Sequence, residues 1–166
     1  DADFEARARR LGLRFGEAAP EDLLLDYTRL FLGPTDILAK PYGSVWLEPG
    51  RGLMQDSTMA VQALYEEGGF ELAEDFHELP DHIAAELEFL YLLIHRQHQA
   101  QQSGDATAIA EVDALRRRFL GSHLGRWVGP FTAAMKSGAT EPFYRELAEL
   151  TERFVTQETA AAGGLT

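Results

Sequence analysis

The sequence predicts an all-α fold, and three observations point to that class. Hydrophobic residues recur at helical spacing along most of the 166-residue chain, no strand-like alternation lasts beyond a few residues, and turn-forming residues separate the periodic segments. We therefore expect a single globular helical domain over residues 1–166, with about six or seven helices. Its N-terminal half (about 1–68) and its C-terminal half (about 81–160) are expected to meet at a glycine-rich, acidic hinge (about 69–80).

The N-terminal half contains three segments of helical period. The first covers residues 4–15, and the second begins at Pro20, a residue that suits the first turn of a helix. A loop rich in Gly and Pro is expected over residues 35–52, and Ser57 is expected to cap the third helix.

The C-terminal half begins with a helix that is hydrophobic on all of its sides. Pro80-Asp81 marks its start, and Asp81 is placed to cap its free N–H groups. Hydrophobic residues on every side are typical of a buried central helix. Three further helices are expected after it, with a kink or break at Gly125 and Gly129-Pro130 and a new start at Pro142.

The composition excludes several classes of protein. The chain has no Cys, which excludes a disulfide framework, a Cys-ligated metal centre and a thiol nucleophile. Its longest hydrophobic run, residues 89–94, is far shorter than a membrane span. With 15 basic and 27 acidic residues the net charge is −12, which disfavours a nucleic-acid partner. We therefore expect a soluble, cytoplasmic protein.

The negative charge is concentrated in one stretch. No basic residue lies between Arg51 and Arg96, whereas the same stretch holds ten acidic residues and carries a charge of −10. The ten are Asp56, Glu66, Glu67, Glu71, Glu74, Asp75, Glu78, Asp81, Glu86 and Glu88. Two interpretations stay open from charge alone: a solvated acidic surface, or a docking face for a cationic partner.

No motif with the spacing of a catalytic or cofactor site is present. His77 and His82 lie five residues apart rather than four, and Pro80 interrupts the helix that a zinc-protease motif requires. A phosphate-binding loop, a dinucleotide turn and a nucleophile elbow are all missing from the sequence. We therefore expect a binding protein without metal or cofactor, and keep a metal- or nucleotide-dependent helical hydrolase as the less favoured alternative.

Some polar and aromatic residues suit binding as well as structure. Tyr42 and Trp46 place two aromatic rings in the expected loop, where they could pack on the core or form a binding surface. Glu86 and Glu88 lie in a hydrophobic helix, and a buried carboxylate there needs partners elsewhere in the fold. His82 suits either a structural hydrogen bond or a pH-sensitive contact.

Several motifs, in a fixed order over about residues 22–155, resemble one known family. They are F-L-G-P at 31–34, P-Y-G-S-V-W-L at 41–47, L-M at 53–54, S-T at 57–58, P-D-H-x-x-x-E-L-E-F-L at 80–90 and F-Y-x-x-L-x-x-L-T at 143–151. This order is similar to that of the TorD/DmsD family of redox-enzyme maturation chaperones. Family members carry a longer N-terminal helix before the position where this sequence begins, and the sequence leaves open whether such a helix precedes residue 1 or is supplied by a partner subunit.

The resemblance implies an all-helical chaperone that is not an enzyme. Such a chaperone binds the twin-arginine leader and the apo form of a molybdopterin oxidoreductase catalytic subunit, aids cofactor insertion, and holds the client back from export by the Tat pathway. A nitrate-reductase-type assembly chaperone is the alternative within the same class. Family members occur as monomers and as swapped dimers, and the sequence leaves both open.

The resemblance also implies where the leader binds. The leader-contact region of the family lies around the hinge and the P-D-H motif. Carried over to this sequence, it points to Tyr42, Trp46, Glu78, Pro80, Asp81, His82 and Glu86. A paired-arginine peptide suits an acidic stretch, because arginine binds carboxylates through a planar pair of donors.

Overall fold

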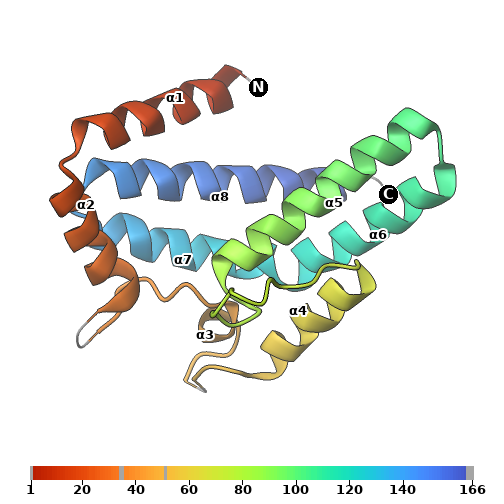
Figure 1. The fold of residues 1–166 in the computed structure, drawn as a ribbon, viewed down its shortest axis with the longest axis horizontal. Helices are drawn as coiled ribbons and strands as arrows, with labels where there is room; N and C mark the ends of the chain where they lie inside the picture. The colour runs from red at the N-terminus through yellow and green to blue at the C-terminus, as the bar shows by residue number, and fades with distance from the viewer. Residues whose placement is uncertain (1, 34–35, 51, 164–166) are drawn as a thin grey trace. The chain divides into compact units, whose positions relative to one another are not determined.

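The computed structural model describes residues 2–33, 36–50 and 52–163, and confirms the all-α prediction over them. Pro34, Thr35 and Arg51, which belong to the expected motifs and loop, lie outside the described residues, as does the end of the chain from residue 164. In the described part the elements are α1 (Ala2–Glu17), α2 (Pro20–Tyr27), the π-helix η1 (Thr28–Leu32), α3 (Gly43–Leu47), α4 (Asp56–Glu67), α5 (Ile83–Ser103), α6 (Ala106–Ser122), α7 (Leu124–Gly138) and α8 (Pro142–Gly163) (Figure 1).

Two expectations about the helices of the N-terminal half are wrong. The segment expected to be a loop contains α3, a helix of five residues that is too short to reveal a helical period. The N-cap of α4 is Gln55 rather than Ser57: its side chain and that of Thr58 form reciprocal hydrogen bonds with the backbone.

Two expectations about the C-terminal helices also need correction. The break falls at His123, whose backbone leaves the helical region, while Pro130 lies inside the continuous helix α7. A Cβ at Gly125 would lie 2.5 Å from the carbonyl oxygen of Leu120, so a glycine allows the close approach at this break. Helix α5 buries one face and leaves Tyr91 67% exposed, so it is not buried on all sides.

The chain divides into two compact units. The first contains residues 1–41 and 128–157, and the second contains residues 42–127 and 158–166. The segment predicted to be a hinge, residues 69–80, lies within the second unit, and its role as a hinge stays a prediction.

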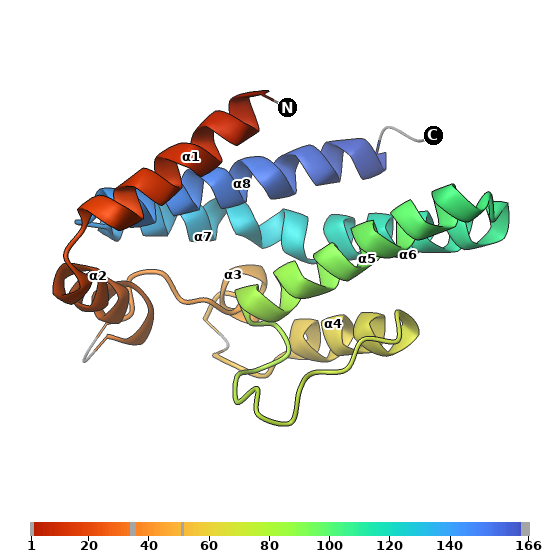
Figure 2. The same ribbon diagram turned by 45° about the horizontal axis from the view of Figure 1, so that its top comes forward.

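The first unit has a small core of its own. Leu30, Ala139 and Tyr144 are buried in it, and the neighbouring hydrophobic side chains of Leu23 and Phe31 pack against them. Helix α1 runs beside α8 in both ribbon views (Figures 1 and 2), and is joined to it by the ion pair between Arg7 and Glu149.

A buried carboxylate fixes the start of α8 within the first unit. Asp26 is 2% exposed, and its Oδ2 accepts hydrogen bonds from the backbone N–H groups of Thr140 and Glu141 at 2.9 and 2.8 Å. Its Oδ1 accepts a hydrogen bond from Arg29 at 3.0 Å. Both oxygens therefore have partners, which is what a buried carboxylate requires.

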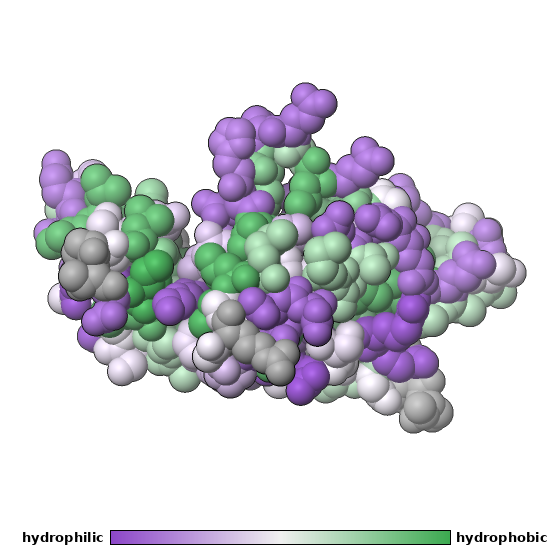
Figure 3. Space-filling view, turned by 90° about the horizontal axis from the view of Figure 1, so that it is seen from below, coloured by the Kyte–Doolittle hydropathy of each residue, from purple (hydrophilic) through white to green (hydrophobic). Residues whose placement is uncertain are grey.

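Hydrophobic side chains gather on the surface of α2 and η1. Figure 3 shows this patch at the left of the face that it draws. Its exposed members are Leu24, Leu25, Tyr27 and Leu32. The packing of the first unit thus leaves a hydrophobic surface on these two elements.

The second unit is built around α5 and α6, which lie side by side in both ribbon views. Three buried aromatic rings hold its core: Phe89 of α5 packs edge-on against Tyr65 of α4 and Phe119 of α6, with ring centroids 4.8 and 5.0 Å apart. A Cβ at Gly68 would lie 2.6 Å from a carbon of the Phe89 ring. Only glycine therefore fits where α4 ends against this core.

Candidate functional site

The structure brings the two main sequence motifs together in the second unit. Tyr42 and His82 form an isolated antiparallel β-bridge, and the N–H of Gly43 donates to the carbonyl oxygen of Asp81 at 2.8 Å. The Tyr42 and His82 rings meet edge to face, with centroids 5.3 Å apart. The Tyr42 hydroxyl donates a hydrogen bond to the carboxylate of Glu78. Residues 36 positions apart in sequence thus share one surface.

His82 rather than Asp81 caps α5. Its Nδ1 accepts a hydrogen bond from the N–H of Ala84 at 3.1 Å, which identifies His82 as the N-cap and corrects the expectation for Asp81. Phe76, which belongs to none of the sequence motifs, packs edge-on against the His82 ring, with ring centroids 6.1 Å apart. Burial lowers the pKa of His82, while the charges of Glu78 and Asp81 act in the opposite direction.

Asp81 holds α3 instead. It is fully buried, and its Oδ2 accepts a hydrogen bond from the N–H of Ser44 at 2.7 Å, in the first turn of α3. Its Oδ1 is buried and has no hydrogen-bond partner among the described residues. In this position Asp81 fixes the backbone that carries Tyr42 and is closed to a direct contact from outside.

Glu86 belongs to a buried cluster with His123 and Trp127. Glu86 is fully buried, the indole N–H of Trp127 donates to both of its oxygens at 3.2 and 3.1 Å, and His123 Nδ1 lies 2.8 Å from Oε1. The other ring nitrogen of His123 lies 2.8 Å from the carbonyl oxygen of Ser57, so it carries a hydrogen and donates. Glu86 therefore satisfies groups elsewhere in the fold, and its carboxylate does not reach the surface.

The buried cluster holds one proton between its acid and its base. Because His123 Nε2 is protonated toward Ser57, the short contact between Nδ1 and Glu86 needs one further proton, on one partner or the other. Burial raises the pKa of Glu86 although the hydrogen bonds from His123 and Trp127 oppose it. Burial would lower the pKa of His123, but the hydrogen bond and the charge of Glu86 raise it above its ordinary value.

Trp46 and Pro80 are near the bridge in sequence but are not the residues that form it. Trp46 is half-buried on α3. The carbonyl oxygen of Pro80 accepts a hydrogen bond from the Tyr65 hydroxyl at 2.8 Å, which fastens the P-D-H motif to α4. We call the partly exposed group Tyr42, Phe76, Glu78 and His82 the surface cluster, because these four contact one another and remain accessible.

The acidic stretch is divided between surface and interior. Eight of its ten acids are exposed, whereas Asp81 and Glu86 are fully buried. Among the exposed acids, Glu67 forms an ion pair with Arg118, and Glu78 accepts the Tyr42 hydroxyl. The surface charge available to a partner is therefore smaller than the sequence total.

Neither a metal centre nor a membrane-spanning helix is present among the described residues. No group of three His, Asp or Glu side chains is arranged to hold a metal ion in the part of the chain that the structure covers. No helix within residues 2–163, where described, is both long and hydrophobic enough to cross a membrane.

A comparison with protein families gives the class of this protein. The family model described as nitrate reductase delta subunit matches residues 1–133. Because this match covers well over half of the chain, the chain belongs to that family. The resemblance to the TorD/DmsD chaperones is confirmed, since curated relatives carry those names.

Three relatives illustrate the similarity. The Tat proofreading chaperone DmsD of Salmonella typhimurium is 29% identical over 157 residues, which cover 93% of this chain and 69% of the relative. The chlorate reductase assembly chaperone protein of Ideonella dechloratans is 33% identical over 160 residues, covering 92% of this chain and 78% of the relative. The chaperone protein TorD of Photobacterium profundum is 28% identical over 149 residues, covering 89% and 67%.

Proposed function

We propose that this protein is a dedicated cytoplasmic chaperone that binds the twin-arginine leader and the apo form of a molybdopterin oxidoreductase catalytic subunit. In this function it aids insertion of the cofactor and holds the client back from export until the cofactor is in place. The chaperone names of its relatives support a binding function without catalysis. The surface cluster is the proposed contact for the leader, with Trp46 and Pro80 beside it.

The observation that carries the proposal is the bridge between Tyr42 and His82. It places the rings of Tyr42 and His82 and the carboxylate of Glu78 on one accessible surface, and both Glu78 and His82 belong to the stretch without a basic residue. A leader offers two guanidinium groups followed by a hydrophobic stretch. Carboxylates pair with the guanidinium groups, and aromatic rings can stack with guanidinium groups and pack against hydrophobic side chains.

Asp81 and Glu86 take part as positioning residues. Asp81 holds the first turn of α3 through the N–H of Ser44, and Glu86 lies under the same backbone. A Cβ at Gly43 would lie 3.1 Å from Glu86 Oε1. Changes at either acid are therefore expected to displace Tyr42 rather than to remove a contact with the leader.

Magnitudes assign different roles to charge and to hydrophobic contact. Exposed ion pairs contribute about 0.2–1 kcal/mol each, whereas micromolar affinity requires about 8 kcal/mol. Burying roughly 400 Å² of hydrophobic leader surface at about 25 cal/mol per Å² gives roughly 10 kcal/mol before the cost of association. The hydrophobic stretch should supply most of the affinity, and the acids should supply orientation and rapid encounter.

Calorimetric titration with synthetic leader peptides tests this function. Replacing both leader arginines by lysine should weaken binding less than replacing the hydrophobic stretch by polar residues of equal length. The reverse order would contradict the division of energy, and no binding of any twin-arginine peptide would contradict the function itself.

The same titration identifies the class of client. The family description mentions nitrate reductase. The relatives are the chaperones DmsD and TorD and a chlorate reductase assembly chaperone. Leaders from each class of reductase, compared at equal length and charge, should differ in affinity, and the tightest should come from the client class. A molybdopterin oxidoreductase recovered with the tagged protein from the source cell would confirm that assignment.

A further inference from the structure

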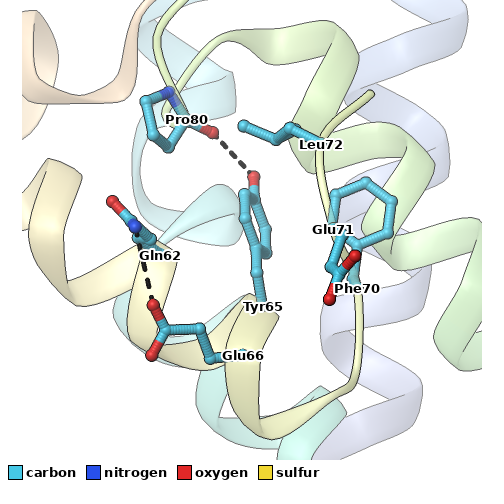
Figure 4. Close-up of a pocket in the computed structure, with 7 residues that line it drawn as sticks. All are labelled: Gln62, Tyr65, Glu66, Phe70, Glu71, Leu72 and Pro80. Atoms are coloured by element: carbon cyan, nitrogen blue, oxygen red, sulfur yellow. Dashed lines mark hydrogen bonds between the residues drawn. The ribbon is translucent and has the colours of Figure 1, made fainter. Parts of the chain in front are cut away.

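A pocket in the second unit lies between α4 and the segment that follows it (Figure 4). Its volume is about 340 Å³. The lining residues are Gln62, Tyr65, Glu66, Phe70, Glu71, Leu72 and Pro80. At the lower end of the roughly 300–1,000 Å³ of ligand pockets, this hollow suits a side chain rather than a large cofactor.

The backbone explains why the hollow stays open. Gly69 adopts a positive φ of 59°, which turns the chain back along α4 and brings residues 70–72 opposite the helix. The hydrogen bond from Tyr65 to the Pro80 carbonyl closes one end, as Figure 4 shows. Arg96 donates to the carbonyl oxygens of Gly68 and Gly69 and so fixes the turn. The walls are therefore held from both ends.

The lining combines a hydrophobic interior with an acidic rim. Tyr65 is buried and Phe70 packs edge-on against it at 5.0 Å, with Leu72 on the same wall. Burial raises the pKa of Tyr65, so its hydroxyl stays protonated and adds no charge to the interior. The exposed carboxylates of Glu66 and Glu71 are the only charged groups among the lining residues.

We propose that this pocket receives a hydrophobic side chain that neighbours the arginine pair of the leader, with a guanidinium held at the rim by Glu66 and Glu71. This inference rests on the proposed function and extends it to a second contact. Charge selects the occupant, because two carboxylates and no lining cation repel anionic ligands and attract a cationic peptide. Pro80 lines the pocket and directly precedes Asp81-His82, so one peptide can contact both the pocket and the surface cluster.

The test uses the whole protein and a labelled synthetic peptide in which an Arg-Arg pair is followed by Leu and then by a run of Ala and Leu. Fluorescence anisotropy gives the affinity of this peptide and of a second in which the first Leu is Ser. With the wild-type protein, the Ser peptide should bind about tenfold to a hundredfold more weakly. In the Leu72→Asn variant, the change from Leu to Ser in the peptide should lower the affinity by less than about threefold, because the pocket no longer distinguishes the two side chains.

Charge reversal at the rim gives a second, independent readout with a matched control. Glu71 and Glu88 are both exposed acids of the same basic-free stretch, and only Glu71 lines the pocket. Glu71→Lys should lower the affinity for the Leu peptide about threefold to tenfold more than Glu88→Lys does.

The outcomes separate this inference from the proposed function. If the wild-type protein binds neither these peptides nor any of the reductase leaders, the proposed function is wrong and the pocket assignment falls with it. The pocket assignment alone is overturned if the wild-type protein binds the Leu peptide and His82→Asn weakens that binding, but the pocket variants have no specific effect. In that case Glu71→Lys and Glu88→Lys bind the Leu peptide with equal affinity, and Leu72→Asn shows the same affinity ratio between the Leu and Ser peptides as the wild-type protein.

Discussion

The surface cluster and the buried cluster share one sequence motif, which contributes His82 to the first and Glu86 to the second, but they differ in exposure and in hydrogen bonding. Residues 42–46 and 78–86 contribute to the surface cluster through Tyr42, Glu78 and His82, which remain accessible. One helical turn after His82, Glu86 is fully buried against His123 and Trp127. A single motif thus supplies both a surface for a partner and the internal support that holds that surface in place.

The acids of the motif fall into two classes according to their burial. A carboxylate on the surface is solvated and free to pair with a partner at small cost, whereas a buried one must have internal partners. Asp26 in the first unit shows the purely structural case, with hydrogen bonds to both oxygens. Variants of the buried cluster should therefore change stability first, and variants of the surface cluster should change binding first.

The largest expected effect is on stability, at Glu86. Replacing Glu86 by Ala leaves the His123 ring and the Trp127 N–H without their buried partner, which should lower the free energy of unfolding by about 3–5 kcal/mol. Urea unfolding followed by circular dichroism measures this loss. Glu88→Ala is the matched control, since Glu88 is exposed two positions along the same helix and should change stability by less than about 0.5 kcal/mol. Equal effects at the two positions would contradict the comparison.

A smaller loss of stability is expected at Gly43, where the two clusters meet. A Cβ there would lie 3.0 Å from Trp127 Nε1 and 3.1 Å from Glu86 Oε1, so Gly43→Ala should lower the free energy of unfolding by about 1–3 kcal/mol. Because the N–H of Gly43 also donates the hydrogen bond to Asp81 that joins the two segments of the surface cluster, the variant should weaken leader binding as well.

Gly121→Ala is the control for that substitution. A Cβ at Gly121 meets nothing within 4 Å and lies inside α6, so the change should leave stability unaltered or raise it by up to about 1 kcal/mol. If Gly43→Ala is as stable as Gly121→Ala, the two clusters are not packed against a common backbone as described.

The two histidines should give opposite dependences on pH. The pKa of His123 and that of Glu86 are raised, so the folded state holds their shared proton more tightly, and their contribution to stability is lost as pH rises through the folded values. The pKa of His82 is lowered from 6.5, so the unfolded state takes up its proton first and stability falls as pH drops below that ordinary value. Protonation would also remove the acceptor that caps α5.

Urea unfolding at a series of pH values measures both effects. Asn can also accept the capping hydrogen bond, so His82→Asn should keep the cap of α5. In this variant the loss of stability at acidic pH should become smaller, while the loss of stability at alkaline pH should be unchanged. If this variant loses as much stability at acidic pH as the wild-type protein does, His82 is not the cause of that loss.

The smallest effect on stability is expected at Tyr42. Tyr42→Phe keeps the ring contact with His82 and removes only the hydroxyl that donates to the exposed carboxylate of Glu78. The free energy of unfolding should fall by no more than about 1 kcal/mol. A loss as large as that of Glu86→Ala would mean that the surface cluster is part of the structural support.

Local sequence signals predicted the helices well and the contacts between distant residues poorly. The all-α class and the start of α8 at Pro142 followed from periodicity and turn formers. Helix α3 was missed because five residues are too few for a period, and because its first turn is held by Asp81 from another segment. The cap of α5 was assigned one residue early, since Asp81 and His82 can both accept an N–H and only the fold decides between them.

The candidate site was likewise predictable in part. The family motifs brought Tyr42, Glu78 and His82 to attention, and a carboxylate in a hydrophobic helix indicated that Glu86 needs partners. The identity of those partners was not predictable, because Trp127 is 41 positions away and no local pattern links it to Glu86. Phe76 carried no signal beyond its hydrophobicity, and its place beside His82 depends on the path of residues 70–80.

The most direct test of the central claim compares two histidines of the same helix. His82 contacts the Tyr42 ring at the start of α5, whereas His95 is exposed further along it and stacks on Tyr91. Calorimetric titration of a twin-arginine leader peptide should show about tenfold weaker binding to His82→Asn, and unchanged binding to His95→Asn, at equal stability of the two variants. Equal affinity of both variants and the wild-type protein would contradict the assignment of leader binding to the surface cluster.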